Sequence, residues 1–503
     1  MPEDDFGAKV ICDNVHGSIG ISRLEQAIIN TRTFQRLKKI KQLGLASYVF
    51  PGAEHSRFAH SIGAMHVMSL MVDQLKLAGC PYVCSDDTNR VKQKLRLAAL
   101  LHDIGHYPLA HLGEQAFQWL DEVQNSTTFM ESVDDDNSDN DLLRSAATKH
   151  ESDAAKHERL GELILTHANS ELQSILAAAE FDPGEIARII NAEDKDNPFY
   201  VQLMSSTLDC DRMDFLLRDS QASGTNFGHV DINYIISNMT WDAINERVCF
   251  LPKARNAIEH FVLARYFSYN LTYHKTVMGF ELMAKALMYV MMKDTAFDWE
   301  STQPIVRSID DIRNRIADDP EFLANFNDEY FWYYLEHWNP PSESKMLNDL
   351  RNSLLSRTPL RAIAEERAFI SKGNDSTPEQ FRYVSRDLIE QLAMNKDASV
   401  LLKDAGVELD RITTVERRIG LEGLPFSRRY NEREPKDEEF LKLIKIHGRD
   451  EASDLIADKG SILHVLCNYE LRTVRVYALL DKDSEQATVL SNVVTSLVSK
   501  HSN

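Results

Sequence analysis

The sequence predicts a mainly α-helical protein with a smaller α/β region at its C-terminal end. Apolar residues recur at helical spacing through most of the first 330 of the 503 residues, whereas strand-like β-branched segments occur only beyond about residue 400. Hydrophobic residues make up 43% and charged residues 26%, as in ordinary globular proteins. A chain of this length usually forms two or more domains. We expect a helical domain over residues 1–330 and an α/β regulatory or oligomerisation region over 331–503.

The helical pattern begins at Leu24 and returns over residues 62–78. Residues 93–105 are apolar on nearly every side, which predicts a buried helix that ends at Gly105. The same spacing predicts four further helical stretches, over residues 150–190, 200–223, 253–293 and 308–327. Strand-like composition marks three segments, 410–416, 443–448 and 471–480.

Residues 122–148 break the helical pattern. They include the polar and acidic run VQNSTTFMESVDDDNSDND, which has too little apolar surface to pack. We therefore expect a mobile surface insertion here.

Charge and cysteine usage exclude several classes of protein. The 56 Lys and Arg against 77 Asp and Glu give a net charge of −21, which argues against a general nucleic-acid coat. None of the six cysteines forms a CxxC pair, so we expect reduced thiols rather than a zinc ribbon or a disulfide framework. The N-terminus has no apolar signal core, and the most apolar stretch, 280–292, contains Glu281 and Lys285. We expect a cytoplasmic protein with no membrane partner.

An adjacent His102-Asp103 pair lies within the predicted buried helix. Two ionisable groups in an apolar helix are costly unless they are paired or bound to a metal. A core histidine bonded to the aspartate is the simpler reading of the pair alone. With His60 and Asp211, however, the pair would form a mixed nitrogen and oxygen site for Mn, Fe, Co, Ni or Mg. The absence of a thiolate argues against structural zinc.

The motifs around these residues resemble the HD-domain deoxynucleoside triphosphate triphosphohydrolases. Residues 13–63, LLHDIGHYPLAH, KHERLG and LDCDRMDFLLRDS occur in the family's order, over roughly residues 9–290. The resemblance implies an HD-domain helical fold with His60, His102, Asp103 and Asp211 as metal ligands. It also implies hydrolysis of a dNTP, with dGTP among the candidates, to deoxynucleoside and inorganic triphosphate, by attack of metal-bound water on the α-phosphorus.

The resemblance places further catalytic residues beside the metal ligands. Arg57 would contact the α-phosphate, to which a guanidinium offers two parallel donors. His106 and His111 follow the His-Asp pair, and Glu114 would orient His111, which would protonate the leaving 5′ oxygen. His157, in KHERLG, would be another active-site histidine, and His150 is the competing candidate.

Substrate contacts are also implied by the resemblance. Arg212 would face the triphosphate, Asp219 the sugar 3′-OH, and Gln42 and Leu43 the sugar and base. Phe215 stands where the mammalian relative has a tyrosine, so one sugar contact is lost. In the helical segment ARYFSYNLTYHKT, the resemblance implies phosphate and sugar contacts from Arg265, Tyr269, Tyr273 and Lys275. A buried helix would show the same spacing of tyrosines.

Regulation and assembly follow from the same likeness. The positions matching an effector-nucleotide site are Val10, Asn30, Gln35 and Lys38, of which Asn30 and Lys38 depart from the family residues. A different effector or none is equally consistent with them. We expect a homo-oligomer (a dimer, tetramer or hexamer) and an Mg ion that accompanies the triphosphate.

Two rival classes stay open from the sequence alone. One is an HD-type phosphodiesterase or nuclease that acts on single-stranded nucleic acid or on a nucleoside monophosphate. The other is a nucleotide sensor that binds without hydrolysis. The triphosphatase-like extent of residues 13–63 opposes the first, and the intact ligand positions oppose the second.

Overall fold

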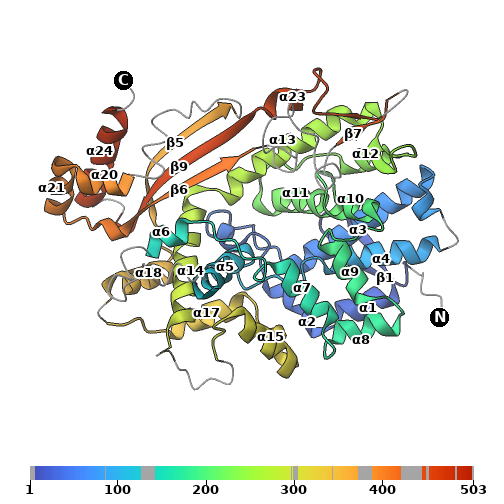
Figure 1. Cartoon of the computed structure of the whole chain (residues 1–503), viewed down its shortest axis with the longest axis horizontal. Helices are drawn as coiled ribbons and strands as arrows, with labels where there is room; N and C mark the ends of the chain where they lie inside the picture. Colours follow the sequence, from blue (N-terminus) through green and yellow to red (C-terminus); the bar gives the residue numbers. More distant parts are fainter. Residues whose placement is uncertain are drawn as a thin grey trace.

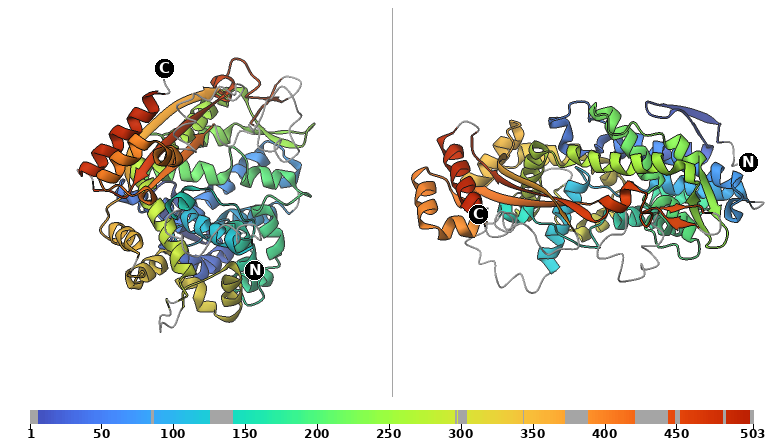
Figure 2. Two further views of the ribbon diagram at one scale, coloured as in Figure 1. Left: turned by 60° about the vertical axis from the view of Figure 1, so that its left-hand side comes forward. Right: turned by 90° about the horizontal axis from the view of Figure 1, so that it is seen from above.

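A large helical body occupies most of the molecule, and a three-stranded sheet lies along one side of it (Figure 1). This computed structural model describes residues 6–84, 87–125, 142–295, 297, 304–342, 344–371, 388–420, 444–448, 452–481 and 484–500. Helix α24 and the hairpin of β1 and β2 lie toward opposite sides of the molecule in Figure 1 and in the right-hand view of Figure 2. The mainly α fold with a smaller α/β C-terminal region is confirmed.

The chain starts with a hairpin that the sequence did not predict. Strands β1 (Lys9–Asp13) and β2 (Gly17–Ile21) pair antiparallel, with Asp13 opposite Gly17. Helix α1 (Arg23–Ile29) follows behind a capping box, in which the Ser22 side chain accepts from the Glu25 amide and Glu25 accepts from the Ser22 amide. Three short elements complete this region: α2 (Arg32–Gln35), η1 (Arg36–Lys39) and η2 (Gly44–Tyr48).

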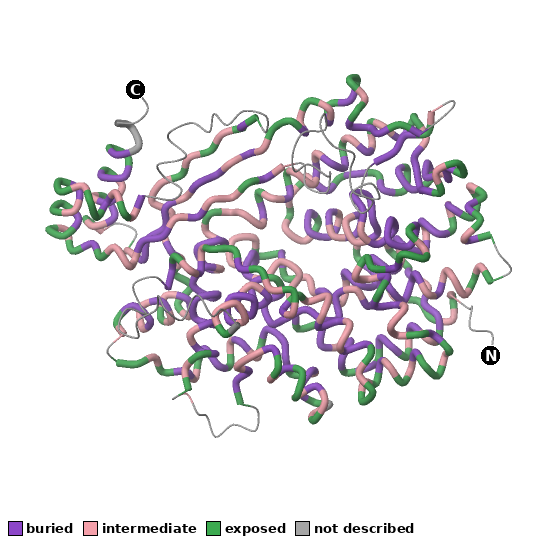
Figure 3. Tube along the Cα trace, viewed as in Figure 1, coloured by how far each residue is buried: buried purple, intermediate pink, exposed green. Residues whose placement is uncertain are grey.

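Helix α3 (Arg57–Leu77) is the centre of the helical body. It packs against α4 (Thr88–Leu101) on one side and α11 (Cys210–Ser223) on the other, and it is buried along most of its length (Figure 3). Its close approach to α11 depends on Gly63, because a Cβ there would overlap the Asp214 carboxylate and the Arg218 guanidinium. The packing of these three helices positions the candidate metal ligands.

The loop after α4 is held from several directions. Helix α4 ends at Leu101, four residues before the predicted Gly105, and turns carry the chain to α5 (His111–Asn125). The buried Arg36 guanidinium donates to the carbonyls of Ile104 and His106, which therefore cannot continue a helix. The Asp328 carboxylate accepts from the amides of Lys41 and Leu109 at 3.0 and 2.7 Å.

Further helices surround this centre. The predicted stretch 150–190 is divided among three helices, α7 (His157–Thr166), α8 (Glu171–Ala178) and α9 (Pro183–Ile190). The same part of the chain also contains α6 (Leu142–Ala147), α10 (Pro198–Met204), α12 (Ile232–Ser237) and α13 (Arg255–Thr272). The remainder are α14 (Lys275–Lys293), α15 (Ile309–Asp318), α16 (Pro320–Asn325), α17 (Asp328–His337) and α18 (Lys345–Leu355). Short 3₁₀ turns occur at η3 (Pro81–Val83), η4 (Pro252–Ala254) and η5 (Leu409–Arg411).

The C-terminal sheet has the antiparallel order β5-β9-β6, from β5 (Arg361–Ser371), β9 (Tyr469–Ala478) and β6 (Ile412–Ile419). Val474 and Val476 of β9 face a separate apolar cluster. Three helices cover that side, α20 (Leu388–Met394), α21 (Lys396–Asp404) and α24 (Glu485–Lys500). The strand predictions at 410–416 and 471–480 are confirmed.

The third predicted strand has a different partner. Strand β7 (Lys445–Ile446) pairs parallel with β4 (Arg247–Phe250) in a sheet of order β3-β4-β7-β8, with β3 (Met239–Asp242) and β8 (Ser453–Asp454) at its edges. Helix α23 (Ile462–Leu466) then leads to β9. Strands β7 and β8 therefore extend a sheet of the helical body.

The predicted domain division stays a prediction, but α17, which begins at Asp328 and crosses residue 330, and α18, which lies beyond it, both pack against α14. The predicted surface insertion over 122–148 is narrower than expected. Residues 122–125 complete α5, and Leu142 and Leu143 of α6 are buried. The remainder, 126–141, lies outside the described residues. No helix among the described residues is long and apolar enough to cross a membrane.

Candidate active site

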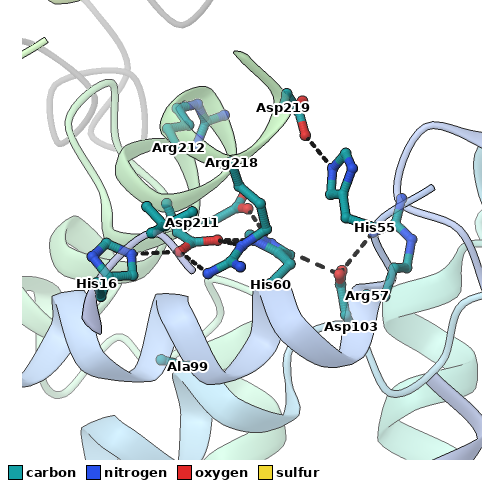
Figure 4. A network of polar contacts seen from close by, with 12 residues as sticks. His16, His55, Arg57, His60, Ala99, Asp103, Asp211, Arg212, Arg218 and Asp219 are labelled. Atoms are coloured by element: carbon teal, nitrogen blue, oxygen red, sulfur yellow. Dashed lines mark hydrogen bonds and ion pairs between the residues drawn. The ribbon is translucent and has the colours of Figure 1, made fainter. Parts of the chain in front are cut away.

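Four side chains from three elements meet beside α3. His60 lies in α3, His102 and Asp103 directly follow α4, and Asp211 lies in the first turn of α11 (Figure 4). The Nε2 atom of His60 is 3.2 Å from His102 Nε2, 3.0 Å from Asp211 Oδ1 and 3.8 Å from Asp103 Oδ2. His102 Nε2 is 3.3 Å from Asp103 Oδ1 and 3.7 Å from Asp211 Oδ1. The four predicted ligands therefore converge on one point.

Hydrogen bonds set both imidazoles in the tautomer that a metal requires. His102 Nδ1 donates to the Ala99 carbonyl at 2.7 Å, and His60 Nδ1 donates to Asp214 Oδ2 at 2.8 Å. Each Nε2 then presents its lone pair to the other ligands. Ligand atoms of His60, His102 and Asp211 all lie within 4.8 Å of one another, so this group could hold a metal ion. Asp103 lies 3.3 Å from His102 and 3.8 Å from His60, and adds a second carboxylate to a mixed nitrogen and oxygen set that suits a divalent transition metal.

The electrostatic field where the four side chains meet favours a bound cation. Burial alone would lower the pKa of both His60 and His102, but the carboxylates around them raise it, to about 10 for His60. Asp103 carries its negative charge although it is only 3% exposed. Burial opposes that charge, but Arg57 and the neighbouring histidines hold the pKa of the carboxyl well below its ordinary value.

Asp103 joins the metal group to a second cluster. Its Oδ2 accepts from Arg57 Nη1 at 2.7 Å, and its Oδ1 lies 3.0 Å from His106 Nε2. Arg57 is 3% exposed and His106 is 1% exposed, so both are anchored by this carboxylate inside the protein. Glycine at position 105 permits the arrangement, because a Cβ there would overlap the His157 carbonyl of α7.

The second cluster centres on Glu114. One carboxylate oxygen, Oε2, contacts His111 Nδ1 at 3.1 Å and His157 Nδ1 at 2.9 Å. Burial opposes the charge of Glu114, but the two imidazoles hold the pKa of the carboxyl well below its ordinary value. Burial would likewise lower the pKa of His157, and Glu114 raises it. The His111 side chain is 69% exposed and can reach a ligand from solvent.

The structure separates the two competing histidines. His157 lies beside Glu114, whereas the two ring nitrogens of His150 contact the Glu122 carboxylate and the Ser145 carbonyl, and its ring stacks on Trp119. His150 therefore packs as a structural residue away from the cluster.

The second cluster does not suit a shared metal in its present geometry. The rings of His106 and His157 stack almost in parallel, with centroids 3.9 Å apart and an interplanar angle of 13°. Imidazole lone pairs lie in the ring plane, so two parallel rings cannot direct them to one ion. Glu114 Oε2 instead joins the His111 and His157 rings directly.

Three of the predicted substrate residues lie on α11. Arg212 pairs with the buried Asp209, and Phe215 is half-buried against the core. Asp219 Oδ1 is bonded to His55 Nε2 at 2.8 Å. Burial raises the pKa of Asp209 to about 6.

Gln42 lies next to His55, because its amide donates to the His55 carbonyl at 3.0 Å. Leu43 packs in a small apolar cluster with Leu271 and Val277, which flank the junction of α13 and α14. His55 thus contacts both Gln42 and Asp219.

The residues predicted on helix 253–293 divide into two sets. Arg265 and Tyr269 of α13 act electrostatically on Asp209 and Arg212 of α11. Tyr269 stacks on Tyr273 at 5.4 Å, but the Tyr273 carbonyl accepts from Arg475 of β9 and the Arg417 guanidinium lies over its ring. Lys275 is exposed at the start of α14. The second pair therefore lies where the C-terminal sheet meets the helical body.

The predicted effector residues lie on the N-terminal elements. Val10 is on β1 and is 63% exposed. Asn30 ends α1, Gln35 donates to the Ile29 carbonyl, and Lys38 lies over the Phe58 ring at 4.6 Å.

Five buried atoms around the site have no hydrogen-bond partner within the part of the chain that the structure describes. Buried polar atoms are normally bonded, so a group of them marks where a polar ligand fits. They are Gln42 Oε1, His55 Nδ1, Arg57 Nε, His106 Nδ1 and Arg212 Nε.

Sequence reasoning missed four residues that support the site: His16, His55, Asp209 and Asp214. Asp214 is fully buried, at the same helical face as the Arg218 that follows four residues later. A buried opposite-charge pair at this spacing within an apolar helix was a readable signal. His16 and His55 lie in turns and gave no periodic signal.

Comparisons with known proteins agree with this geometry. An HD-domain family model matches residues 57–197. An uncharacterised protein of Bacillus subtilis, YwfO, is 27% identical over 404 residues, 80% of this chain and 77% of that protein. The deoxynucleoside triphosphate triphosphohydrolase SAMHD1 homolog of Dictyostelium discoideum is 29% identical over 282 residues, 55% of this chain and 48% of that protein. The chain spans about half the length of several other curated relatives.

A solved structure extends the likeness to the whole fold. A phosphohydrolase from Bacteroides thetaiotaomicron matches with a TM-score of 0.63 at 22% identity, over 93% of this chain and 99% of that one. The chain is an HD-domain protein with the ligand set of an HD-type hydrolase. As the motifs predicted, deoxynucleoside triphosphate triphosphohydrolases are among its relatives: SAMHD1 of Gallus gallus is 40% identical over 129 residues, 24% of this chain and 20% of that protein.

Proposed function

We propose that the protein is a metal-dependent dNTP triphosphohydrolase that releases deoxynucleoside and inorganic triphosphate. The observation that carries the proposal is the junction at Asp103, where a four-ligand metal group adjoins a histidine–glutamate cluster through a single carboxylate. A hydrolase needs an activated water and a proton donor on opposite sides of the reacting phosphorus. The printed activity of the SAMHD1 relatives supplies the substrate class.

His60, His102, Asp103 and Asp211 would hold the metal. Their donor set fits Mn, Fe, Co, Ni or Mg, and a divalent ion there supplies Lewis acidity that makes a water nucleophilic near neutral pH. Asp214 and the Ala99 carbonyl accept the Nδ1–H of the two imidazoles, which leaves Nε2 of each ring as the atom that would bind the metal. Mg bound to the substrate would neutralise part of the triphosphate charge.

Arginines would bind the phosphates. Arg57 has one nitrogen on Asp103 and an unpartnered Nε, so the guanidinium is held in place with donor capacity remaining. Arg212 is anchored on Asp209 in the same way. Both would stabilise charge that grows on the α-phosphate oxygens. Arg265, Tyr269, Tyr273 and Lys275 extend this polar surface along α13 and α14.

His111 would deliver the proton to the leaving 5′ oxygen. Glu114 orients its Nδ1, which directs Nε2 outward from an exposed ring. His106 and His157 complete the cluster behind it. On the nucleoside side, Asp219, Gln42 and Leu43 would contact the sugar and base beside Phe215. A homo-oligomer and an effector nucleotide at Val10, Asn30, Gln35 and Lys38 remain part of this proposal.

Product analysis tests the function. The purified protein, supplied with Mn²⁺ and Mg²⁺, is given each dNTP singly and then in mixtures, and the products are separated by ion-exchange chromatography. We expect triphosphate and deoxynucleoside from the wild type and from Asp73→Ala, an exposed carboxylate on α3. Asp103→Ala should abolish both products. Activity confined to mixtures would identify an effector, whereas cleavage of single-stranded nucleic acid without triphosphate release would favour a nuclease.

A further inference from the structure

A buried carboxylate behind the metal group collects four donors. Asp214 is fully buried, and its Oδ2 accepts from His60 Nδ1 and from Arg218 Nε, each at 2.8 Å. Its Oδ1 accepts from Arg218 Nη2 at 2.9 Å and from His16 Nε2 at 2.6 Å. Burial opposes the charge of Asp214, but these donors hold its pKa well below the ordinary value. The orientation of His60 therefore depends on how Asp214 is held.

His16 reaches the Asp214 carboxylate from a segment 198 residues away in the chain. It lies in the turn between β1 and β2, and its side chain is 6% exposed. Asp13 builds that turn, because its Oδ1 accepts from the amides of Val15 and His16 at 2.9 Å each. The same Asp13 carboxylate accepts from Arg218 Nη1 at 2.9 Å. The hairpin and α11 are thus joined by two adjacent polar contacts, and Figure 4 shows His16 beside Arg218.

We propose that His16 is a positioning residue of the metal centre: it fixes Asp214, which in turn holds His60 with Nε2 toward the metal. The inference rests on the metal-ligand assignment made in the proposed function. Arg218 makes two of the four contacts to Asp214 and also spans Asp13, so it does not hold the carboxylate alone. The 2.6 Å hydrogen bond from His16 Nε2 holds Oδ1 of Asp214 in place.

The physical consequence is a loss of metal affinity when His16 is removed. Partners behind a ligating histidine fix its ring and raise its basicity, and their loss typically weakens metal binding about 10–100-fold. His16 acts one step further out, through Asp214, so we expect about a tenfold effect. The fold should persist, because Arg218 still neutralises the buried carboxylate.

The test compares His16→Ala with His16→Gln. The glutamine can donate an N–H to Asp214, whereas alanine cannot. Full-length proteins are stripped with chelator and titrated with Mn²⁺, and free Mn²⁺ is followed by electron paramagnetic resonance. Thermal unfolding of the stripped proteins is measured in parallel. His66→Gln is the control, since the His66 ring lies 5.3 Å from His16.

We expect His16→Ala to bind Mn²⁺ about tenfold more weakly at an unchanged metal-free melting temperature, and His16→Gln and His66→Gln to bind like wild type. Equal affinity of wild type and His16→Ala would overturn the inference and leave the metal site intact. Weakening that is matched by a lower metal-free melting temperature, and not rescued by glutamine, would also overturn it. Wild type that binds no Mn²⁺ would refute the metal site itself.

Discussion

Replacing Glu114 by glutamine tests the proton-donor cluster. Glu114 is 7% exposed, and its Oε2 serves both His111 and His157 at 3.1 and 2.9 Å. Glutamine keeps one oxygen but removes the charge. A hydrogen bond to a charged group contributes roughly 1.5–3 kcal/mol, against about 0.5–1.5 kcal/mol for a neutral one. Two weakened contacts thus remove about 2–3 kcal/mol, which corresponds to a fall in kcat of roughly 30–150-fold.

The assay is initial-rate kinetics with a dNTP at saturating Mn²⁺, and Glu122→Gln is the matched control. Glu122 lies two turns further along α5 and bonds His150 at 2.7 Å, away from the metal group. We expect Glu114→Gln to lower kcat with little change in KM, Glu114→Ala to lower it more, and Glu122→Gln to leave it unchanged. Wild-type kcat in Glu114→Gln would refute the assigned role.

The same variant has a pH signature in stability. The folded pKa of Glu114 is lowered, so its contribution is present above the unfolded value near 4.5 and is lost in acid. The folded pKa of His157 is raised, so its contribution is full below the unfolded value near 6.5 and fades as pH rises through the folded pKa. The destabilisation of Glu114→Gln should therefore be largest between about pH 5 and 6.5. A difference in unfolding free energy that does not vary with pH would contradict the pairing.

Two further predictions concern packing and metal. Gly63→Ala places a methyl group against Asp214 and Arg218, so its free energy of unfolding in urea should fall by at least about 3 kcal/mol. Gly161→Ala is the control, because a Cβ there meets only ordinary van der Waals contacts and should be tolerated. An unaffected Gly63→Ala would mean that α3 and α11 separate easily. Mn²⁺ at about 100 times its Kd should stabilise the chelated protein by roughly 2.7 kcal/mol, seen as a higher melting temperature that Asp103→Ala does not show. Equal shifts in both proteins would place the bound ion elsewhere.

The candidate metal ligands could be picked out because each is an ionisable residue within or directly after an apolar helical segment. His102-Asp103 stands out in LRLAALLHDIG, and His60 and Asp211 begin two other buried helices. The motif context then selected His157 over His150. The three-helix packing that brings them together needed the structure, because residues 60 and 211 are remote in the chain.

The supporting residues could not be predicted in the same way. His16 and Asp13 lie on a hairpin whose glycine-rich sequence, DNVHGSIG, has no clear strand alternation. Their partners, Asp214 and Arg218, are about 200 residues away in α11. A long-range polar network of this kind has no period in the sequence. The early end of α4 at Leu101 has the same origin, since Arg36 and Asp328 hold the loop beyond it.

The most direct test of the central claim is hydrolysis of a dNTP in ¹⁸O-labelled water, with mass analysis of both products. Attack of water on the α-phosphorus breaks the bond to the 5′ oxygen and predicts one ¹⁸O atom in the inorganic triphosphate and none in the deoxynucleoside. Label in the deoxynucleoside would indicate cleavage at carbon. Labelled pyrophosphate or orthophosphate, with no triphosphate, would contradict the proposed reaction.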